Sequence, residues 1–162
     1  MAALSDGLVE LIERFDHVAF GVHDVEACLP LVELLGGQFY AGADHVRNRF
    51  RWVQFEVLGG SKLELIAPLS RDSFLMRFLE KRGEGVHHLT YKVTDVKESA
   101  RRAEGFGYRI SGLHLHPSWS EVFLHPSDAH GALIQLASWS DESAWRTATL
   151  EDVLAGRSID ET

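Results

Sequence analysis

The sequence has few cysteines and no long apolar run, the features that would mark a disulfide-bonded or a membrane protein. Its 162 residues include one cysteine, four prolines and two methionines. The single cysteine, Cys28, excludes a disulfide within the chain and is in keeping with a reducing compartment. No apolar run approaches the length of a membrane span, and the N-terminus lacks a charged region followed by a hydrophobic one. We therefore expect a cytoplasmic protein that does not associate with membranes.

Basic residues are scarce relative to acidic ones. Sixteen Lys and Arg residues stand against 24 Asp and Glu residues, which gives a formal net charge of −8 at pH 7. Because the acidic residues are spread along the chain, this balance argues against a nucleic-acid partner. The hydrophobic content of 45% is enough for a real core. The length allows one compact domain or two fused halves.

One pattern of residues occurs twice, at a constant spacing of 71 positions. His17 matches His88, Glu64 matches Gln135, and several glycines, valines and aspartates match at the same offset. A constant offset over half a chain indicates two copies of one supersecondary unit. The first copy predicts strands near 16–22, 37–42, 50–58 and 62–67 and a helix over 25–35. The second predicts strands near 87–93, 108–113, 119–125 and 131–137 and a helix over 96–105.

The predicted fold class is therefore α+β, with tandem βαβββ units in one domain of two pseudo-symmetric halves. The domain is expected to span residues 15–138, with halves at about 15–67 and 86–138. A helix over 73–82 connects the halves. An amphipathic pattern over 5–14 predicts an N-terminal helix within 1–14, and 139–162 is expected to form a helical tail on the surface, frayed at its end.

Four residues with metal-ligand chemistry occupy two equivalent positions of each copy, namely His17, Glu64, His88 and Gln135. A polar side chain inside an apolar strand is costly unless it is paired, hydrogen-bonded or bound to a cation. If the copies pack around an axis, these four side chains converge on one point. Outward strand positions without a metal remain the alternative. Because neighbouring strand residues face opposite sides, only one of His87 and His88 can take part, and the repeat selects His88.

These features resemble those of the vicinal oxygen chelate superfamily, which includes glyoxalases, bleomycin-resistance proteins and dioxygenases. The run Phe78–His88, followed by Phe123–Pro126, looks most like methylmalonyl-CoA epimerases. The resemblance implies an eight-stranded U-shaped cleft around one divalent metal ion (Co, Ni, Zn, Mn or Fe). It also implies that the metal chelates two substrate oxygens and stabilises an enolate-like intermediate. The family's ligand positions fall on His17, Glu64, His88 and Gln135. We expect a small-molecule substrate, such as an acyl-CoA or a 2-oxo or dicarboxylic acid, and a homodimer.

The chain departs from the epimerase pattern at two positions. The epimerases usually carry a carboxylate where Gln135 stands, and a second acid where this chain has Arg47 or Asn48. Epimerisation needs two positioned acid/base groups, and an amide cannot accept a substrate proton at neutral pH. Gln135, Asp44 and Glu121 are the candidate catalytic residues. We expect weak or no methylmalonyl-CoA epimerase activity, and a divalent metal site with a net charge of +1 that polarises an anionic substrate strongly.

Candidate substrate-binding residues are Arg47, Arg49, Arg51 and His125. The arginines alternate along a predicted strand, so one face would carry three guanidiniums suited to phosphates or carboxylates. A solvated strand face is the alternative. His125 is expected either at the rim of the cleft or in a structural turn.

Several functions remain open. The residues and the resemblance favour a metal-dependent isomerase or lyase that moves a proton next to a carbonyl, resembling methylmalonyl-CoA epimerase. A glyoxalase-type lyase is a rival, because that branch also mixes His, Glu and Gln ligands. Two histidines and one carboxylate would also suit an iron-dependent extradiol-type dioxygenase. A non-catalytic small-molecule binding protein could keep the cleft and lack the bases.

Overall fold

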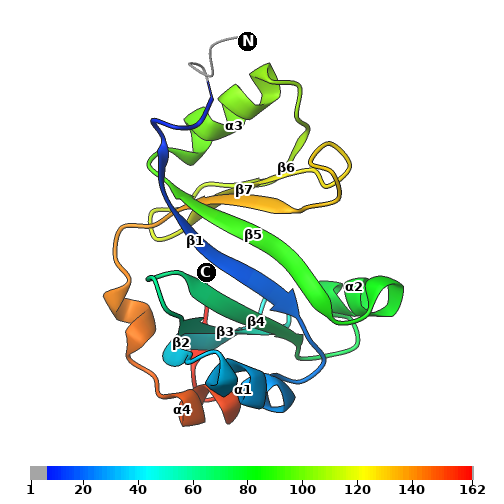
Figure 1. Ribbon diagram of the computed structural model, residues 1–162, viewed down its shortest axis with the longest axis vertical. Coiled ribbons are helices and arrows are strands. Elements are labelled where there is room, and N and C mark those ends of the chain that lie inside the picture. The colour runs from blue at the N-terminus through cyan, green and yellow to red at the C-terminus, as the bar shows by residue number, and fades with distance from the viewer. Residues whose placement is uncertain (1–6, 162) are drawn as a thin grey trace. The chain divides into compact units, whose positions relative to one another are not determined.

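The computed structural model describes residues 7–161, which form two compact units, each built from two separate stretches of chain. Unit 1 combines the segment up to Asp16 with His88–Ser140. Unit 2 combines His17–His87 with the segment from Asp141 onward. Figure 1 labels the α-helices and strands β1 to β7.

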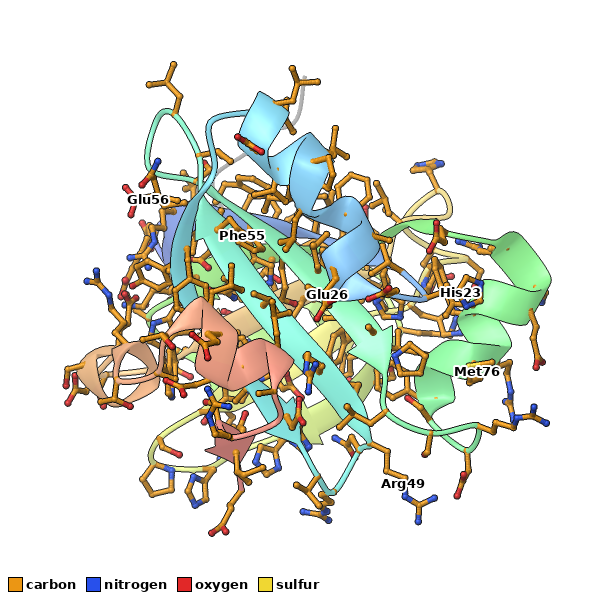
Figure 2. All side chains as sticks on the ribbon, turned by 90° about the horizontal axis from the view of Figure 1, so that it is seen from below. His23, Glu26, Arg49, Phe55, Glu56 and Met76 are labelled. Carbon is orange, nitrogen blue, oxygen red and sulfur yellow. The ribbon has the colours of Figure 1, made fainter. Side chains whose placement is uncertain are left out.

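The sheet of unit 2 follows the strand order β1-β4-β3-β2-β9. Its strands are β1 (Ile12–Gly21, in this unit from His17 on), β2 (Gln38–His45), β3 (Phe50–Glu56), β4 (Lys62–Pro68) and β9 (Ile159–Asp160). β1 and β4 are parallel, and β4, β3 and β2 pair antiparallel. Helix α1 (Val25–Leu34) begins after Asp24, whose carboxylate accepts a hydrogen bond from the Glu26 N–H. It covers one face of the sheet, and Phe55 lies beneath it (Figure 2).

The sheet of unit 1 follows the order β5-β8-β7-β6. Its strands are β5 (Gly85–Val93, in this unit from His88 on), β6 (Ile110–His114), β7 (Ser120–Leu124) and β8 (Ile134–Ser138). Helix α3 (Val96–Gly105) begins after Asp95, which caps it through the Glu98 N–H. Its apolar side packs on Val93, Val122 and Leu136. The opposite face of the sheet is therefore the one that carries polar side chains.

The two units repeat the same strand register, and the predicted α+β fold of βαβββ-like units is confirmed. Val18 pairs with Leu63 in unit 2, and Leu89 pairs with Ile134 in unit 1, each 71 positions later. The offset fails in β7, because Gln54 of β3 faces Glu64 whereas Phe123 of β7 faces Gln135. The connection from β7 to β8 is thus two residues longer than its counterpart, and the gapless comparison misaligns that strand.

The structure lacks the predicted N-terminal helix over its described residues, and it confirms the helices of the tail but not its placement on the surface. Residues 7–11 form bends and turns and Ile12 begins β1, so no helix occupies 7–14; residues 1–6 lie outside the described part. The tail contains the 3₁₀ helix η2 (Ser143–Arg146), helix α4 (Leu150–Leu154) and β9. Val153 of α4 is fully buried in the core of unit 2, and β9 pairs with β2. The tail is therefore part of the unit and is not merely laid on its surface.

Helix α2 (Phe74–Arg82) matches the predicted connecting helix. Ser73 caps its first turn, and it ends at Gly83, which has a positive φ of 75°. Within residues 7–161, no helix is long and apolar enough to cross a membrane.

Candidate metal centre

His17 and Glu64 are neighbours on the polar face of unit 2. Leu63 and Leu65 point into the core under α1, so Glu64 between them faces the other side of β4. His17 is 1% exposed and Glu64 is 7% exposed. The imidazole Nε2 of His17 lies 3.6 Å from the Oε2 of Glu64. A nitrogen and a carboxylate oxygen that are both buried and close together are suitable donors for one cation.

Gln54 supports this pair from the adjacent strand. Its side chain lies opposite Glu64 in the β3–β4 register, and its Nε2 donates a hydrogen bond of 2.6 Å to Glu64 Oε2. Gln54 is itself buried. The carboxylate is therefore held by a neutral donor that fixes its position without cancelling its charge. The sequence pattern did not identify Gln54, although the short hairpin between β3 and β4 fixes which residue faces Glu64.

Lys62 is a second buried residue that the sequence pattern did not single out. It lies opposite His17 in the β1–β4 register, on the same face of β4 as Glu64, and is only 5% exposed. Its Nζ lies 4.8 Å from the ring centroid of Tyr40, a cation–π distance. The sequence alternation Lys62-Leu63-Glu64-Leu65 could have identified Lys62, because it places Lys62 and Glu64 on the same face of the strand. This face of unit 2 thus carries a cation as well as the predicted ligands.

In unit 1 the polar face carries His88 and Gln135. His88 is 8% exposed and Gln135 is 6% exposed. Thr90, opposite Gln135 in the β5–β8 register, donates a hydrogen bond of 2.5 Å from Oγ1 to Gln135 Oε1. On its other side, Gln135 Nε2 donates a hydrogen bond of 2.6 Å to Glu121 Oε2. Glu121, a predicted catalytic residue, therefore lies directly beside a predicted ligand.

His87 has different surroundings from His88. Its ring packs edge-on against Phe74 and Phe78 of α2, at centroid distances of 5.9 Å and 4.9 Å. Burial, with a smaller contribution from the charge of Arg82, lowers the pKa of His87 to about 4. His87 is therefore a packed, neutral imidazole near pH 7.

Asp44 and Arg51, predicted for catalysis and for substrate binding, hold each other. Arg51 donates from Nε and Nη2 to the two carboxylate oxygens of Asp44, at 2.6 Å and 3.0 Å, and from Nη1 to the carbonyl oxygen of Leu154. Since Arg51 alternates with Gln54 along β3, the pair lies on the opposite face from Glu64. This placement does not support a catalytic role for Asp44.

The prediction that three arginines share one strand face is wrong. Arg47 and Arg49 lie in the turn between β2 and β3, and Arg49 has a positive φ of 55°. Figure 2 shows Arg49 at the tip of this hairpin, where it pairs with Asp72. His125 follows β7 and bonds through Nδ1 to the hydroxyl of Ser127, 2.6 Å away, in a turn. Substrate binding by these residues stays a prediction.

The predicted ligands have chemistry that suits a divalent metal. In unit 2, the buried residues His17 and Glu64 offer an imidazole and a carboxylate, and in unit 1 the buried His88 offers a second imidazole, all of them donors of the kind that such an ion accepts. Gln135 would add a neutral amide oxygen. Neutral imidazoles and carboxylates accept several first-row divalent metals, so the donor set does not select one.

Known proteins resemble the chain in sequence and in fold. Residues 16–119 match the model of the Glyoxalase/Bleomycin resistance protein/Dioxygenase superfamily. An ethylmalonyl-CoA/methylmalonyl-CoA epimerase of Cereibacter sphaeroides is 36% identical over 135 residues, covering 78% of this chain and 98% of the relative. The matched range of the family model includes His17, Glu64 and His88 and stops short of Gln135.

Solved epimerase structures share the fold. The methylmalonyl-CoA epimerase from Mycobacterium tuberculosis has a TM-score of 0.73 and 28% identity, covering 89% of this chain and 96% of that one. A variant of the Streptomyces coelicolor methylmalonyl-CoA epimerase, in complex with 2-nitronate-propionyl-CoA, has a TM-score of 0.69 and 27% identity, covering 80% and 99%. An acyl-CoA analogue is thus bound by a protein of this fold.

Proposed function

Because the chain belongs to the Glyoxalase/Bleomycin resistance protein/Dioxygenase superfamily, we propose that it is a divalent-metal-dependent isomerase or lyase acting on an acyl-CoA substrate. The metal would polarise two substrate oxygens and so stabilise negative charge that develops beside the carbonyl. His17, Glu64, His88 and Gln135 would hold it, within the eight-stranded cleft that the resemblance implies. The homodimer and the cytoplasmic location remain part of the proposal.

The observation that carries this proposal is the repeated polar position in two apolar strand pairs. His17 and Glu64 on β1 and β4 correspond to His88 and Gln135 on β5 and β8, and all four side chains are buried. Buried polar groups need hydrogen bonds or a bound cation, and Gln54 and Glu121 already hydrogen-bond Glu64 and Gln135. A shared cation would be a further partner of these side chains, and acyl-CoA substrates such as those of the relatives carry oxygens that it would chelate.

The proton transfers of this enzyme would differ from a two-base epimerisation. Gln135 cannot act as a base, and Asp44 is held by Arg51 on the opposite face of its sheet. Loss of one general base typically costs about 10²–10⁴ in rate. We therefore expect methylmalonyl-CoA to be a poor substrate, and another acyl-CoA to be the better one.

Metal analysis tests the proposed ligands. Protein purified without added metal should contain close to one divalent ion per chain by mass spectrometry. His17→Ala and His88→Ala should each abolish binding, because each removes an imidazole donor. His87→Ala is the matched control, since it removes the neighbouring imidazole from its packing against α2 and should leave the metal in place. Loss of metal in His87→Ala but not in His88→Ala would contradict the proposal.

Proton exchange tests the chemistry. Methylmalonyl-CoA incubated with the protein in deuterated water should exchange its α-proton slowly, and Gln135→Glu should accelerate that exchange. Removal of the metal should abolish exchange in both proteins. Rapid exchange with inversion in the wild-type protein would show that other residues supply two bases.

A further inference from the structure

Glu121 holds the amide of Gln135 in one orientation, and we infer that it is a positioning residue that makes Gln135 competent to bind metal. This inference rests on the metal site proposed above. A glutamine binds a cation only through its oxygen, because the amide nitrogen has no available lone pair. Which end of the amide faces the site therefore decides whether residue 135 is a ligand at all.

The contacts of Gln135 allow only one orientation of its amide. Nε2 lies 2.6 Å from Glu121 Oε2, and an ionised carboxylate can only accept hydrogen bonds. A reversed amide would place its oxygen against that carboxylate, and the two acceptors would repel each other. Thr90 alone does not decide, because a hydroxyl can donate or accept. Glu121 is therefore the residue that sets the orientation.

The orientation leaves the amide oxygen able to bind a cation. Thr90 Oγ1 donates to Gln135 Oε1 at 2.5 Å and uses one of its two lone pairs. The bond from Nε2 to a charged acceptor polarises the amide and increases the negative charge on Oε1. Glu121 thus acts on the ligand oxygen through the amide, without touching the metal.

Glu121 is itself fixed by a tryptophan that directly precedes β7 and stacks on one that directly follows β8. Trp119 Nε1 donates to Glu121 Oε2 at 3.0 Å, and the Trp119 ring stacks on Trp139 with centroids 4.9 Å apart. Lys92 lies over the Trp139 ring at 5.0 Å. The hydrogen bond from Trp119 keeps the Glu121 carboxylate in place, so that the carboxylate can hold the Gln135 amide against rotation.

Unit 2 also contains a hydrogen-bonded glutamine and glutamate, with the two roles exchanged, although Gln54 lies directly opposite Glu64 whereas Glu121 lies diagonally across from Gln135. There Gln54 Nε2 donates to Glu64 Oε2, also at 2.6 Å, and the carboxylate occupies the ligand position. In unit 1 the amide occupies that position and the carboxylate is its neighbour. Each half therefore keeps one carboxylate next to or within the proposed ligand set.

A charge-exchange experiment tests this inference. Glu121→Gln should weaken Co²⁺ binding by about 10–100-fold, because the amide of Gln135 can then reverse. The double variant Glu121→Gln/Gln135→Glu should restore binding to near the wild-type value, since it puts a carboxylate at the ligand position and an amide beside it, the combination that Glu64 and Gln54 form in unit 2. Dissociation constants from calorimetry and the visible spectrum of bound Co²⁺ are the readouts, so activity is not needed. Glu13→Gln, which removes an ion pair with Lys92 in the same unit, should bind as wild type does.

The outcomes separate the two proposals. Absence of Co²⁺ binding by the wild-type protein would overturn both the metal site and the role of Glu121. Wild-type binding that Glu121→Gln leaves unchanged, or a double variant as weak as Glu121→Gln, would overturn the role of Glu121 alone. Circular dichroism of each variant checks that the fold is retained, and recovery in the double variant excludes misfolding as the cause of the loss.

Discussion

His87 and His88 are adjacent in sequence and chemically identical, yet they belong to different surroundings. His87 contacts two phenylalanine rings of α2, whereas His88 shares a strand face with Thr90. The aromatic contacts favour a neutral ring because the charged form loses hydration there. The His87 imidazole thus packs against aromatic rings, whereas the His88 imidazole is buried on the strand face of the predicted metal ligands.

The lowered pKa of His87 makes stability depend on pH. The unfolded chain binds a proton at His87 near pH 6.5, while the folded chain does so only near pH 4. Between these values the unfolded state holds more protons. The contribution of neutral His87 to the free energy of unfolding is therefore complete above pH 6.5 and is lost as the pH falls to 4. We expect a loss of about 1–3 kcal/mol across this window. Urea unfolding in EDTA at several pH values measures it.

His87→Phe should remove this part of the pH dependence, because phenylalanine does not titrate. His23→Phe, which changes an exposed histidine of the same unit, is the control and should keep the wild-type dependence. Identical pH profiles for wild type and His87→Phe would show that His87 does not cause the effect.

Of the residues around the proposed ligands, the sequence predicted some and missed others for a definite reason. The offset of 71 identified His17, Glu64, His88 and Gln135 because their strand pairs keep the same register. The hydrogen-bond partner of Gln135 could not be found this way, since Phe123 lies opposite Gln135 in the β7–β8 register and Glu121 lies two positions away along β7. Only the structure showed that Glu121 and Gln54 play exchanged roles.

At the level of elements, β2 lies close to its neighbours at Gly42. A Cβ built there would lie 2.8 Å from the carbonyl oxygen of Trp52 and 3.1 Å from Val153 Cγ1. Because the first of these atoms is backbone, a side chain cannot be accommodated by rotation of a neighbour. Gly42 therefore lets α4 and β3 pack against β2 together.

Gly42→Ala should destabilise the protein by about 1–3 kcal/mol, since strands β2 and β3 must separate to admit the methyl group. Gly105→Ala is the matched control, because its methyl group would enter open space at the end of α3. That variant should be neutral or slightly stabilising, as alanine favours helix. Chemical denaturation of both variants measures the difference, and equal stabilities would contradict the close approach.

The turn between β2 and β3 shows where the sequence pattern misleads. Arginines at 47, 49 and 51 alternate as they would in a strand, but Val46 to Arg49 form a turn. Arg49 adopts a left-handed conformation that ends strand geometry, and arginine carries no strong sequence signal for that conformation. The other strands and helices predicted between residues 15 and 138 match the structure within a few residues, because apolar periodicity and aspartate caps mark them.

At the scale of the whole molecule, the proposed metal should act as a folding ligand. A ligand that binds only the folded state at a concentration 100 times its dissociation constant stabilises it by about 2.7 kcal/mol. For a chain of this size we expect Co²⁺ to raise the melting temperature by about 5–10 °C, and EDTA to reverse the increase. His17→Ala should melt at the same temperature with and without Co²⁺. A shift of equal size in that variant would place the binding elsewhere.

Because each unit is built from distant stretches of chain, unit 2 cannot complete its fold until late in synthesis on the ribosome. Strands β1 to β4 emerge together, but α4 and β9, which complete unit 2, follow more than sixty residues after His87. At about 5–20 residues per second, translation leaves an interval of several seconds. During that interval Val153 is not yet present to cover its neighbours in the core, among them Val53. The nascent chain therefore exposes an apolar patch, which a chaperone could bind, until translation has passed α4.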